Sequence, residues 1–360
     1  MRIAMSSPRK GWGGAATLAV DLSRGLQARG HEVVLFCKPE SALHQELRGE
    51  FACEPVLYGI DFPPAAIWRS IGALRRHRTD VVLSLVRMDL RLTAPAAKLA
   101  GIPVVAHRAE LEPFSRVPHR RLLLDRLPDH WVANSRANRE IMLRSGAWLT
   151  EDDVSTIYNG INPEPYRSAS AADLGLPAGA VAVGYVGRLV IEKGLPELAA
   201  AWRRLAPDHP DLHLVIAGEG NYEKELKRRL GDAPRVRWLG FRRDIPEILK
   251  ALDLVVMPSW EEPFGLVATE AMAAGKPVLA TCAGGLAEVV VDGETGCLVP
   301  PRDVVALAQA IVALASDATL RTRMGQAGIA HVERCFSSDR VVEEYERVLF
   351  RAVQKATRAR

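Results

Sequence analysis

The chain has 360 residues, of which 48% are hydrophobic and 25% are charged, and its formal net charge is +4. A domain usually holds roughly 100–200 residues, so this length predicts two domains, each with its own core. The composition excludes a disordered chain, and the small net charge excludes an obvious nucleic-acid binder. The five cysteines are scattered, odd in number and without CxxC spacing, which argues against a disulfide framework or a zinc site.

The first ten residues lack the apolar segment of a signal peptide, and no run of 18 apolar residues occurs anywhere. We therefore expect a cytoplasmic protein without a membrane-spanning helix. The excess of positive charge lies in residues 1–167, while residues 168–360 are close to neutral. This excess suits an anionic substrate or an anionic membrane surface, but an ordinary Arg-rich solvated surface explains it equally simply.

In the first half, short apolar runs alternate with helix-like segments, which is the pattern of βα units around a mostly parallel sheet. Strands are predicted at Met1–Met5, Val33–Cys37, Val81–Val86, Pro103–His107 and His130–Ala133. Helices are predicted at Ala15–Arg29, Ala65–Arg78, Leu92–Ala100 and Ser135–Ser145.

The second half repeats this rhythm, and a Pro-, Asn- and Ser-rich stretch at 159–170 predicts the hinge between the halves. Its strands are predicted at Val181–Val186, Leu212–Ala217, Val236–Leu239, Leu254–Met257, Val278–Ala280 and Gly296–Val299. The apolar spacing in Ser337–Val353 predicts an amphipathic helix. We expect an α/β chain with an N-terminal Rossmann-like domain (1–167), a C-terminal Rossmann-like domain (168–336), a cleft between them and a last helix (337–360). Ligands in such sheets lie beyond the carboxyl ends of the strands.

The first candidate site is the loop 187–194, directly after a predicted strand. Gly187 lets the backbone approach a ligand closely, and Arg188 and Lys193 add two positive charges that suit a diphosphate. The alternative is an ordinary loop with solvated basic side chains.

The second candidate site follows the strand Leu254–Met257, where a helix is predicted to open at about Phe264. Free N–H groups of Phe264, Gly265 and Leu266 would favour a phosphate. Glu262 could accept hydrogen bonds from sugar hydroxyls, and Glu270 from a ribose. The alternative is that Glu262 complements the helix dipole and Glu270 is an exposed helical glutamate.

Together these segments resemble the retaining nucleotide-sugar glycosyltransferases of the GT4 family, which have the two-lobed GT-B fold. The pattern G-R-x4-K-G is met at 187–194, and the pattern E-x7-E is met by Glu262 and Glu270. Further matches lie at 159–162, 217–220 and 284–296. The resemblance covers nearly the whole chain, and it implies that the last helix crosses back to brace the first domain.

In the first domain the resemblance assigns roles to two short segments. Gly13 and Gly14, in a glycine-rich loop after the first strand, would lie over the donor diphosphate. His107, at the end of a strand, would contact the transferred sugar near its C6 hydroxyl. The following Arg108 and Glu110 depart from the commoner small or acidic neighbours of that histidine.

The implied reaction moves a sugar from a nucleoside diphosphate sugar to an acceptor hydroxyl with retention at the anomeric carbon. Arg188 and Lys193 would stabilise the departing diphosphate, Glu262 would orient the sugar and Glu270 would hold the ribose. The family is described with front-side attack, in which the leaving phosphate accepts the acceptor's proton and no protein nucleophile is needed. The chain contains no D-x-D motif, so we expect neither a metal nor another cofactor.

The resemblance favours a UDP-sugar donor, with a GDP-sugar next, and an acceptor in lipopolysaccharide, glycolipid or exopolysaccharide synthesis. The acceptor would be a glycan or a lipid-linked molecule. The basic stretches 69–78 and 116–126 interleave with leucines, which fits either docking on an anionic inner-membrane surface or two helices with buried leucines. Two other functions remain open: a nucleotide-sugar 2-epimerase on the same fold, and a catalytically silent scaffold.

Overall fold

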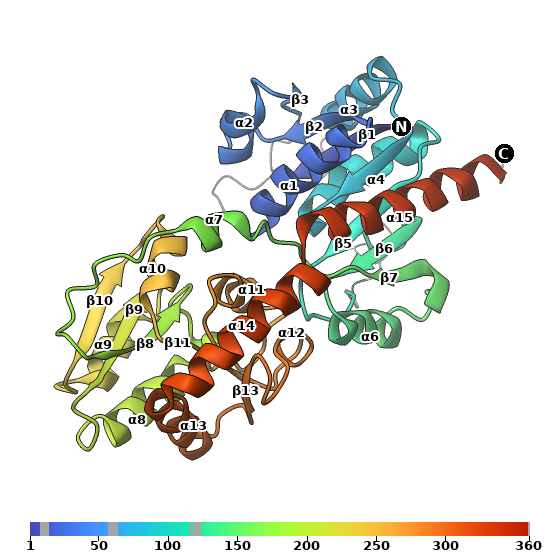
Figure 1. Cartoon of the computed structure of the whole chain (residues 1–360). Helices are drawn as coiled ribbons and strands as arrows, with labels where there is room; N and C mark the ends of the chain where they lie inside the picture. The colour runs from blue at the N-terminus through green and yellow to red at the C-terminus, as the bar shows by residue number, and fades with distance from the viewer. Residues whose placement is uncertain (8–13, 57–63, 116, 118–123, 359–360) are drawn as a thin grey trace. The chain divides into compact units, whose positions relative to one another are not determined.

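The computed structural model describes residues 1–7, 14–56, 64–115, 117 and 124–358 (Figure 1). The chain divides into two compact units, one made of Met1–Gly160 with Ser338–Arg360 and the other of Ile161–Ser337. Ile161 belongs to the second unit because its N–H donates to the carbonyl of Phe336 at 2.9 Å and its backbone bridges Ser337. By contacts the second unit therefore begins seven residues before the predicted domain start at 168.

The first unit contains a seven-stranded parallel sheet in the order β3-β2-β1-β4-β5-β6-β7. Its strands are β1 (Arg2–Ser7), β2 (Glu32–Cys37), β3 (Ala52–Glu54), β4 (Val81–Ser84), β5 (Val104–Arg108), β6 (His130–Ala133) and β7 (Val154–Thr156). The two edge strands, β3 and β7, were not predicted, because each has only three residues and no run of apolar side chains.

Helices cover both faces of this sheet because the strands are apolar on both sides. One face packs against α1 (Gly14–Ala28), α2 (Ala42–Leu47) and α15 (Ser338–Arg358). The other packs against α3 (Pro64–Arg76), α4 (Leu90–Leu99) and α6 (Arg136–Ser145). The last helix lies along α1 (Figure 1), so the end of the chain completes the core of the first unit.

The second unit contains a six-stranded parallel sheet in the order β10-β9-β8-β11-β12-β13. Its strands are β8 (Val181–Val186), β9 (Leu212–Ala217), β10 (Val236–Gly240), β11 (Leu254–Met257), β12 (Val278–Thr281) and β13 (Gly296–Val299). Each lies within one residue of its predicted range. These long apolar runs are recognisable in the sequence because both faces of each strand are covered.

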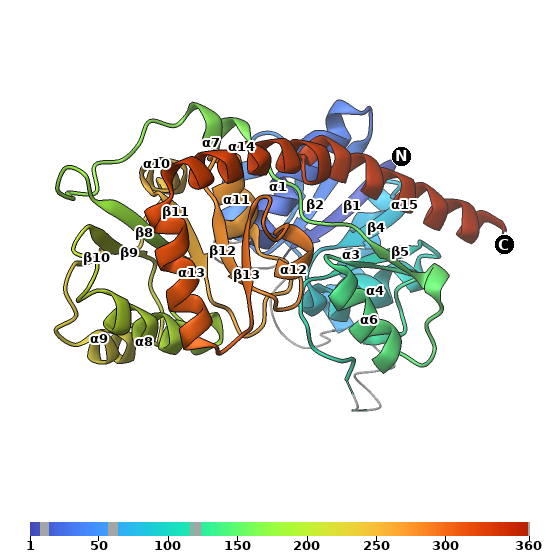
Figure 2. The same cartoon turned by 60° about the horizontal axis from the view of Figure 1, so that its bottom comes forward.

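Helices α8 (Leu195–Leu205), α9 (Glu223–Leu230) and α13 (Val304–Ser316) pack together against one face of this sheet (Figure 2). Helices α10 (Ile245–Ala251), α11 (Leu266–Ala273) and α14 (Ala318–Cys335) form a second group, with the short helices α7 (Glu164–Ser168) and α12 (Leu286–Val289) beside α11. In the described part of the chain no single helix is long and apolar enough to cross a membrane, although α13 and α14, bent by 98°, pass that test jointly by length and composition.

Candidate active site

The second sheet has a topological switch point between β8 and β11. From β8 the chain proceeds outward through β9 and β10, and it then returns to build β11, β12 and β13 on the other side. The loops that leave neighbouring strands in opposite directions create room for a ligand at their carboxyl ends. The two candidate segments predicted from the sequence, after β8 and after β11, are the loops at this point.

Glycines allow the backbones of these loops to touch. Gly194 has a φ of 67°, and a Cβ there would lie 1.7 Å from the carbonyl oxygen of Pro258, which follows β11. A Cβ at Gly218, after β9, would lie 1.9 Å from the carbonyl oxygen of Gly187. Any larger residue at these positions would push the loops apart, so the glycines set the spacing of the site.

An ion pair joins the two loops. The Nζ of Lys193, in the short 3₁₀ turn Ile191–Lys193, lies 2.5 Å from Oε2 of Glu262. Glu262 is 8% exposed, and the same oxygen accepts a hydrogen bond from the Ser259 hydroxyl at 3.2 Å. Two of the residues predicted for the site, 69 positions apart in the sequence, are thus in direct contact. A carboxylate held by an ammonium group and a hydroxyl is fixed in orientation, which a sugar-binding group requires.

Arg188 and Gly187 occupy the start of the first loop. The Tyr185 hydroxyl donates to the carbonyl of Arg188 at 2.8 Å, which fixes the backbone, while the Arg188 side chain is exposed. Gly187 has a φ of 148°, a conformation that side-chain-bearing residues rarely adopt. The loop therefore combines a fixed backbone with a cation in solvent.

The helix after the second loop begins at Leu266, so its predicted start at about Phe264 was two residues early. The reason is Gly265, whose φ of 105° and ψ of 56° lie outside the right-handed helical region. The Phe264 side chain is buried and packs edge-on against Phe336, with ring centroids 5.6 Å apart. Because this side chain is buried, only the backbone of Phe264 could contact a ligand.

Glu270 lies on α11 and is half-buried rather than exposed. Burial raises its pKa to about 7, although a hydrogen bond with the side chain of Tyr166 on α7 opposes this shift. The carboxyl group is therefore close to half protonated at neutral pH. The sequence singled out Glu270 by motif spacing but gave no sign of the partner Tyr166 or of the shifted pKa.

In the first unit, His107 is held by a residue from the other end of the chain. Its Nδ1 lies 2.7 Å from the Tyr345 hydroxyl on α15, and burial lowers its pKa to about 4, so the ring is neutral at pH 7. Tyr345 was predicted only as an apolar position of the last helix. The signal that could have distinguished it is its hydroxyl, because a buried tyrosine hydroxyl usually needs a partner.

The predicted glycine-rich loop of the first unit is only partly described. Gly14 is the exposed first residue of α1. Gly13 lies outside the described residues.

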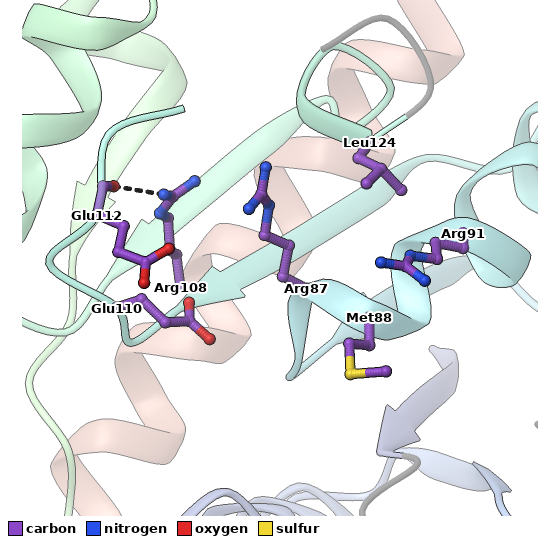
Figure 3. Close-up of a pocket in the computed structure, with 7 residues that line it drawn as sticks. All are labelled: Arg87, Met88, Arg91, Arg108, Glu110, Glu112 and Leu124. Atoms are coloured by element: carbon purple, nitrogen blue, oxygen red, sulfur yellow. Dashed lines mark hydrogen bonds between the residues drawn. The ribbon is translucent and has the colours of Figure 1, made fainter. Parts of the chain in front are cut away.

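A pocket of about 280 Å³ opens at the carboxyl ends of β4 and β5 (Figure 3). Three arginines and two glutamates supply its polar lining: Arg87, Arg91, Arg108, Glu110 and Glu112. Arg108 and Glu110 are the residues that depart from the family pattern. The sequence did not predict this pocket, which depends on the approach of two loops.

One group of metal-ligating side chains occurs in the described part of the chain, and it lies near β2 and β3. Ligand atoms of Cys37, His44 and Cys53 all lie within 4.8 Å of one another. Two thiols and an imidazole form a donor set that suits zinc. The cysteine spacing gave no indication of this group, because the pairing of β2 with β3 creates it. It lies in the first unit and contains none of the residues predicted for the reaction.

The profile of the glycosyl transferases group 1 matches residues 167–331, and that of glycosyltransferase family 4 matches residues 12–165. Together the two profiles match most of the chain, and both contain segments that the sequence motifs singled out. The chain belongs to the family 4 glycosyltransferases, which have the GT-B fold.

Solved structures agree with this membership. The Anabaena protein HepE, in a crystal structure with UDP and glucose, superposes with a TM-score of 0.83 and 26% identity over 97% of this chain and 99% of that one. A glycosyltransferase from Rickettsia africae superposes with a TM-score of 0.85 at 20% identity, over 98% of both chains, which supports the fold alone.

The matches to the following curated relatives cover only part of this chain and part of each relative. The glycogen synthase of Mycobacterium tuberculosis is 38% identical over 201 residues, which are 54% of this chain and 47% of that protein. The D-inositol 3-phosphate glycosyltransferase of Corynebacterium kroppenstedtii is 31% identical over 306 residues, 79% of this chain and 66% of that protein. The chain spans about half of the length of several curated relatives that it matches.

Proposed function

We propose that this family 4 member transfers a sugar from a nucleoside diphosphate sugar to an acceptor hydroxyl, with retention at the anomeric carbon. A UDP-sugar is the preferred donor and a GDP-sugar the next. The contact between Lys193 and Glu262 at the switch point carries this proposal, because it brings a cation for a diphosphate and a carboxylate for a sugar into one place. The likeness to HepE, crystallised with UDP and glucose, supports the same donor class.

In this reaction the bond between the anomeric carbon and the diphosphate breaks, and a bond to the acceptor oxygen forms on the same face. The acceptor's proton passes to the leaving phosphate oxygen. Arg188 and Lys193 stabilise the charge that develops on the diphosphate. Glu262 orients the sugar through its hydroxyls, and Glu270 binds the ribose.

Backbone groups and His107 complete the proposed donor site. The N–H groups of Phe264, Gly265 and Leu266 precede or open α11, where they favour a phosphate. Gly187 lets the backbone approach the diphosphate, and Gly13 and Gly14 would do so from the first unit. The neutral ring of His107 would hydrogen-bond the transferred sugar.

We further propose that the transfer needs no metal ion and no other cofactor. Arg188 and Lys193 supply the positive charge that a divalent cation provides in other nucleotide-sugar enzymes. Transfer that is unchanged by EDTA is expected, and its complete loss on chelation would refute metal independence.

The proposed acceptor is a glycan or a lipid-linked molecule of lipopolysaccharide, glycolipid or exopolysaccharide synthesis, used at the cytoplasmic side of the membrane. The exposure of the side chains on α3 decides which of them could contact a membrane. Leu74, a leucine of the basic stretch 69–78, is buried in the core, whereas Trp68 on the same helix is 68% exposed. Flotation with anionic liposomes at low salt, compared between wild type and Trp68→Ala, tests this attachment. Wild-type protein that stays in the unbound fraction would contradict the proposed membrane attachment.

The first experiment for the proposed function is thermal unfolding with UDP, GDP, ADP or CMP, with and without EDTA, on wild type and Glu270→Ala. A ligand at about 100 times its dissociation constant adds roughly 2.7 kcal/mol of stability, which is easily visible. We expect UDP to shift the wild type, with or without EDTA, and to shift the variant much less. No shift with any nucleotide would indicate a catalytically silent scaffold.

Product analysis then separates transfer from epimerisation. The donor is incubated alone and with acceptor, and its sugar is examined for inversion at C2. Conversion of the donor without acceptor would identify a nucleotide-sugar 2-epimerase instead.

A further inference from the structure

The end of β2 and the edge strand β3 bring two cysteines to the same face of the first sheet. In the parallel pairing of these strands Leu35 lies beside Cys53. Side chains alternate along a strand, so Cys37, two residues after Leu35, points to the same side as Cys53. Glu54, the next residue of β3, points to the opposite side, where it pairs with Arg76 on α3 at 2.8 Å.

Helix α2 covers the face with the two cysteines and supplies an imidazole. The spacing of Leu43, His44 and Leu47 places all three on one side of this helix. The two leucines are buried in the core against the sheet. Their packing turns His44 toward the two thiols, and the three ligand atoms all lie within 4.8 Å of one another.

This group of three side chains is closed on its inner side and open on its outer side. Cys37 is fully buried, whereas His44 and Cys53 are half-buried, so a metal ion can reach the group from solvent. Zn²⁺ with two thiolates and a neutral imidazole forms a complex without net charge, which a half-buried position tolerates far better than an isolated ion. The open side leaves the fourth tetrahedral position to water.

Zinc would replace only weak contacts of these side chains. The thiol of Cys53 donates to the carbonyl of Phe51 at 3.5 Å, and the Glu40 N–H donates to Nδ1 of His44 at 3.3 Å. Zinc bound through Nδ1 would displace the second hydrogen bond. Zinc bound through Nε2 would move the ring proton to Nδ1 and break the same bond. Either way, His44 exchanges one long hydrogen bond for a coordinate bond.

The strand pairing disfavours a disulfide as the alternative use of the two thiols. Cys37 lies one strand across from Cys53 and two residues along, which in a regular ladder places their Cα atoms about 8 Å apart. A disulfide usually needs a separation of about 4.4–6.8 Å. Zinc spans a wider gap, because it adds a bond of about 2.3 Å to each sulfur.

A metal ion at this place would fasten two short elements. Strand β3 has three residues and lies at the edge of the sheet, and α2 has six residues, less than two turns. Elements of this size are marginal without tertiary support. We propose that Cys37, His44 and Cys53 bind a zinc ion that ties β3 and α2 to the end of β2. The group contains none of the residues proposed for transfer, so this zinc supports the fold of the first unit and takes no part in the reaction.

The test is metal binding by the untagged full-length protein in reducing buffer. Bound zinc is measured by atomic emission after dialysis against metal-free buffer. Cobalt(II) is then titrated into metal-free protein, because thiolate ligands give cobalt a charge-transfer band in the near ultraviolet and tetrahedral coordination gives intense visible bands. The variants are Cys53→Ser and His44→Gln. The matched control is Cys297→Ser, which replaces another half-buried cysteine, on β13 of the second unit.

We expect the wild type to bind one equivalent of zinc or cobalt and to show the thiolate band. Each ligand variant should weaken cobalt binding at least about tenfold, the loss that even an altered outer-shell partner can cause. Cys297→Ser should bind as the wild type does. Zinc should raise the melting temperature of the wild type and of this control, but not of the two ligand variants. His44→Gln keeps the test valid if the replacement of a cysteine impairs folding.

Three results would overturn the zinc site: no bound zinc and no thiolate band, equal binding by the wild type and both ligand variants, or loss of the band in Cys297→Ser as well. A parallel sample is prepared without reductant, alkylated and analysed by mass spectrometry. A disulfide between Cys37 and Cys53 in that sample would show that the thiols pair with each other and would also contradict the proposal.

Discussion

At the scale of single residues, the charged groups of the second unit are held by partners close in space but distant in sequence. Lys193 contacts Glu262, and Glu270 is half-buried beside Tyr166. The contact with Lys193 fixes the orientation of the Glu262 carboxylate. Burial of Glu270 raises the pKa of its carboxyl group and so lowers its negative charge at neutral pH. Both effects lead to predictions about individual side chains.

Replacement of Lys193 by Met removes a cation from the site while keeping most of the side-chain volume. We expect kcat for transfer to fall by roughly 10²–10³-fold, as for the loss of one group that stabilises a transition state. Steady-state kinetics with a UDP-sugar check this. The exposed Lys224→Met on α9 is the control and should keep wild-type kcat. An unchanged kcat in Lys193→Met would exclude a role for this lysine in the reaction.

The raised pKa of Glu270, about 7, predicts that the proposed donor binding depends on pH. If the ionised carboxylate binds the ribose, the affinity for UDP-glucose should fall about tenfold between pH 8 and pH 6, because the ionised fraction falls to roughly a tenth. UDP-glucose is the suitable probe because it lacks a terminal phosphate that titrates in this range. Fluorescence titration of wild type and Glu270→Gln measures the affinity, and the variant should show a weak, nearly flat profile.

The same pKa shift affects stability. The folded state binds the proton of Glu270 more tightly than the unfolded state does. The resulting contribution to the unfolding free energy is therefore present at low pH and is lost as the pH rises from about 4.5 to about 7. Glu270→Gln should therefore gain stability relative to wild type between pH 5 and pH 8. Urea unfolding at both pH values measures this, and a constant difference would contradict the raised pKa.

At the scale of elements, the site depends on loops that meet because glycines leave space for them. Gly194 approaches Pro258, and Gly218 approaches Gly187, so the loops after β8, β9 and β11 lie in close contact through their backbones. The strands set the approximate position of these loops, and the glycines allow the loop backbones to approach one another closely.

Gly194→Ala should disrupt this structure, because its Cβ would overlap the Pro258 carbonyl and the backbone has a positive φ. We expect a loss of about 1–3 kcal/mol in unfolding free energy and a marked loss of UDP binding. Gly179→Ala is a matched control, since it also has positive φ, at 81°, but no atom within 4 Å of the added Cβ. Denaturant unfolding and nucleotide titration of both variants provide the comparison. Equal effects would show that backbone strain, not contact between the loops, is responsible.

At the scale of the whole molecule, the first unit is discontinuous in sequence and the second is continuous. Helix α15 contributes Val341, Val342, Tyr345, Val348 and Leu349 to the core of the first unit. Burial of such side chains is worth about 1.5–3 kcal/mol each, so their sum rivals the entire stability of a typical domain, 5–15 kcal/mol.

Residues 161–337 expressed alone should fold cooperatively, whereas residues 1–160 alone should not. A fusion of 1–160 to 338–360 through a short Gly–Ser linker should restore folding, because Gly160 already lies against Ser338. Circular dichroism melting and size-exclusion chromatography distinguish these cases. A stable, monomeric 1–160 fragment would show that the last helix is dispensable to this core.

The sequence by itself determined the parallel α/β architecture, most strand positions and the motifs of the second unit. It could do so because a strand buried on both faces is a continuous apolar run, and because loops such as 187–194 have a distinctive local composition. Motif spacing also singled out Glu262 and Glu270, and the family resemblance singled out His107 at the end of a strand.

Only the tertiary structure decided which of these side chains meet and in what charge state. Distant segments meet in the pairs Lys193–Glu262 and His107–Tyr345 and in the group Cys37, His44 and Cys53. The Nε and Nη1 donors of Arg108, in contrast, have no partner among the described residues. A local pattern encodes backbone conformation, but burial and hydrogen-bond partners depend on how the whole chain packs. For that reason the raised pKa of Glu270 and the arginine pocket could be found only in the folded protein.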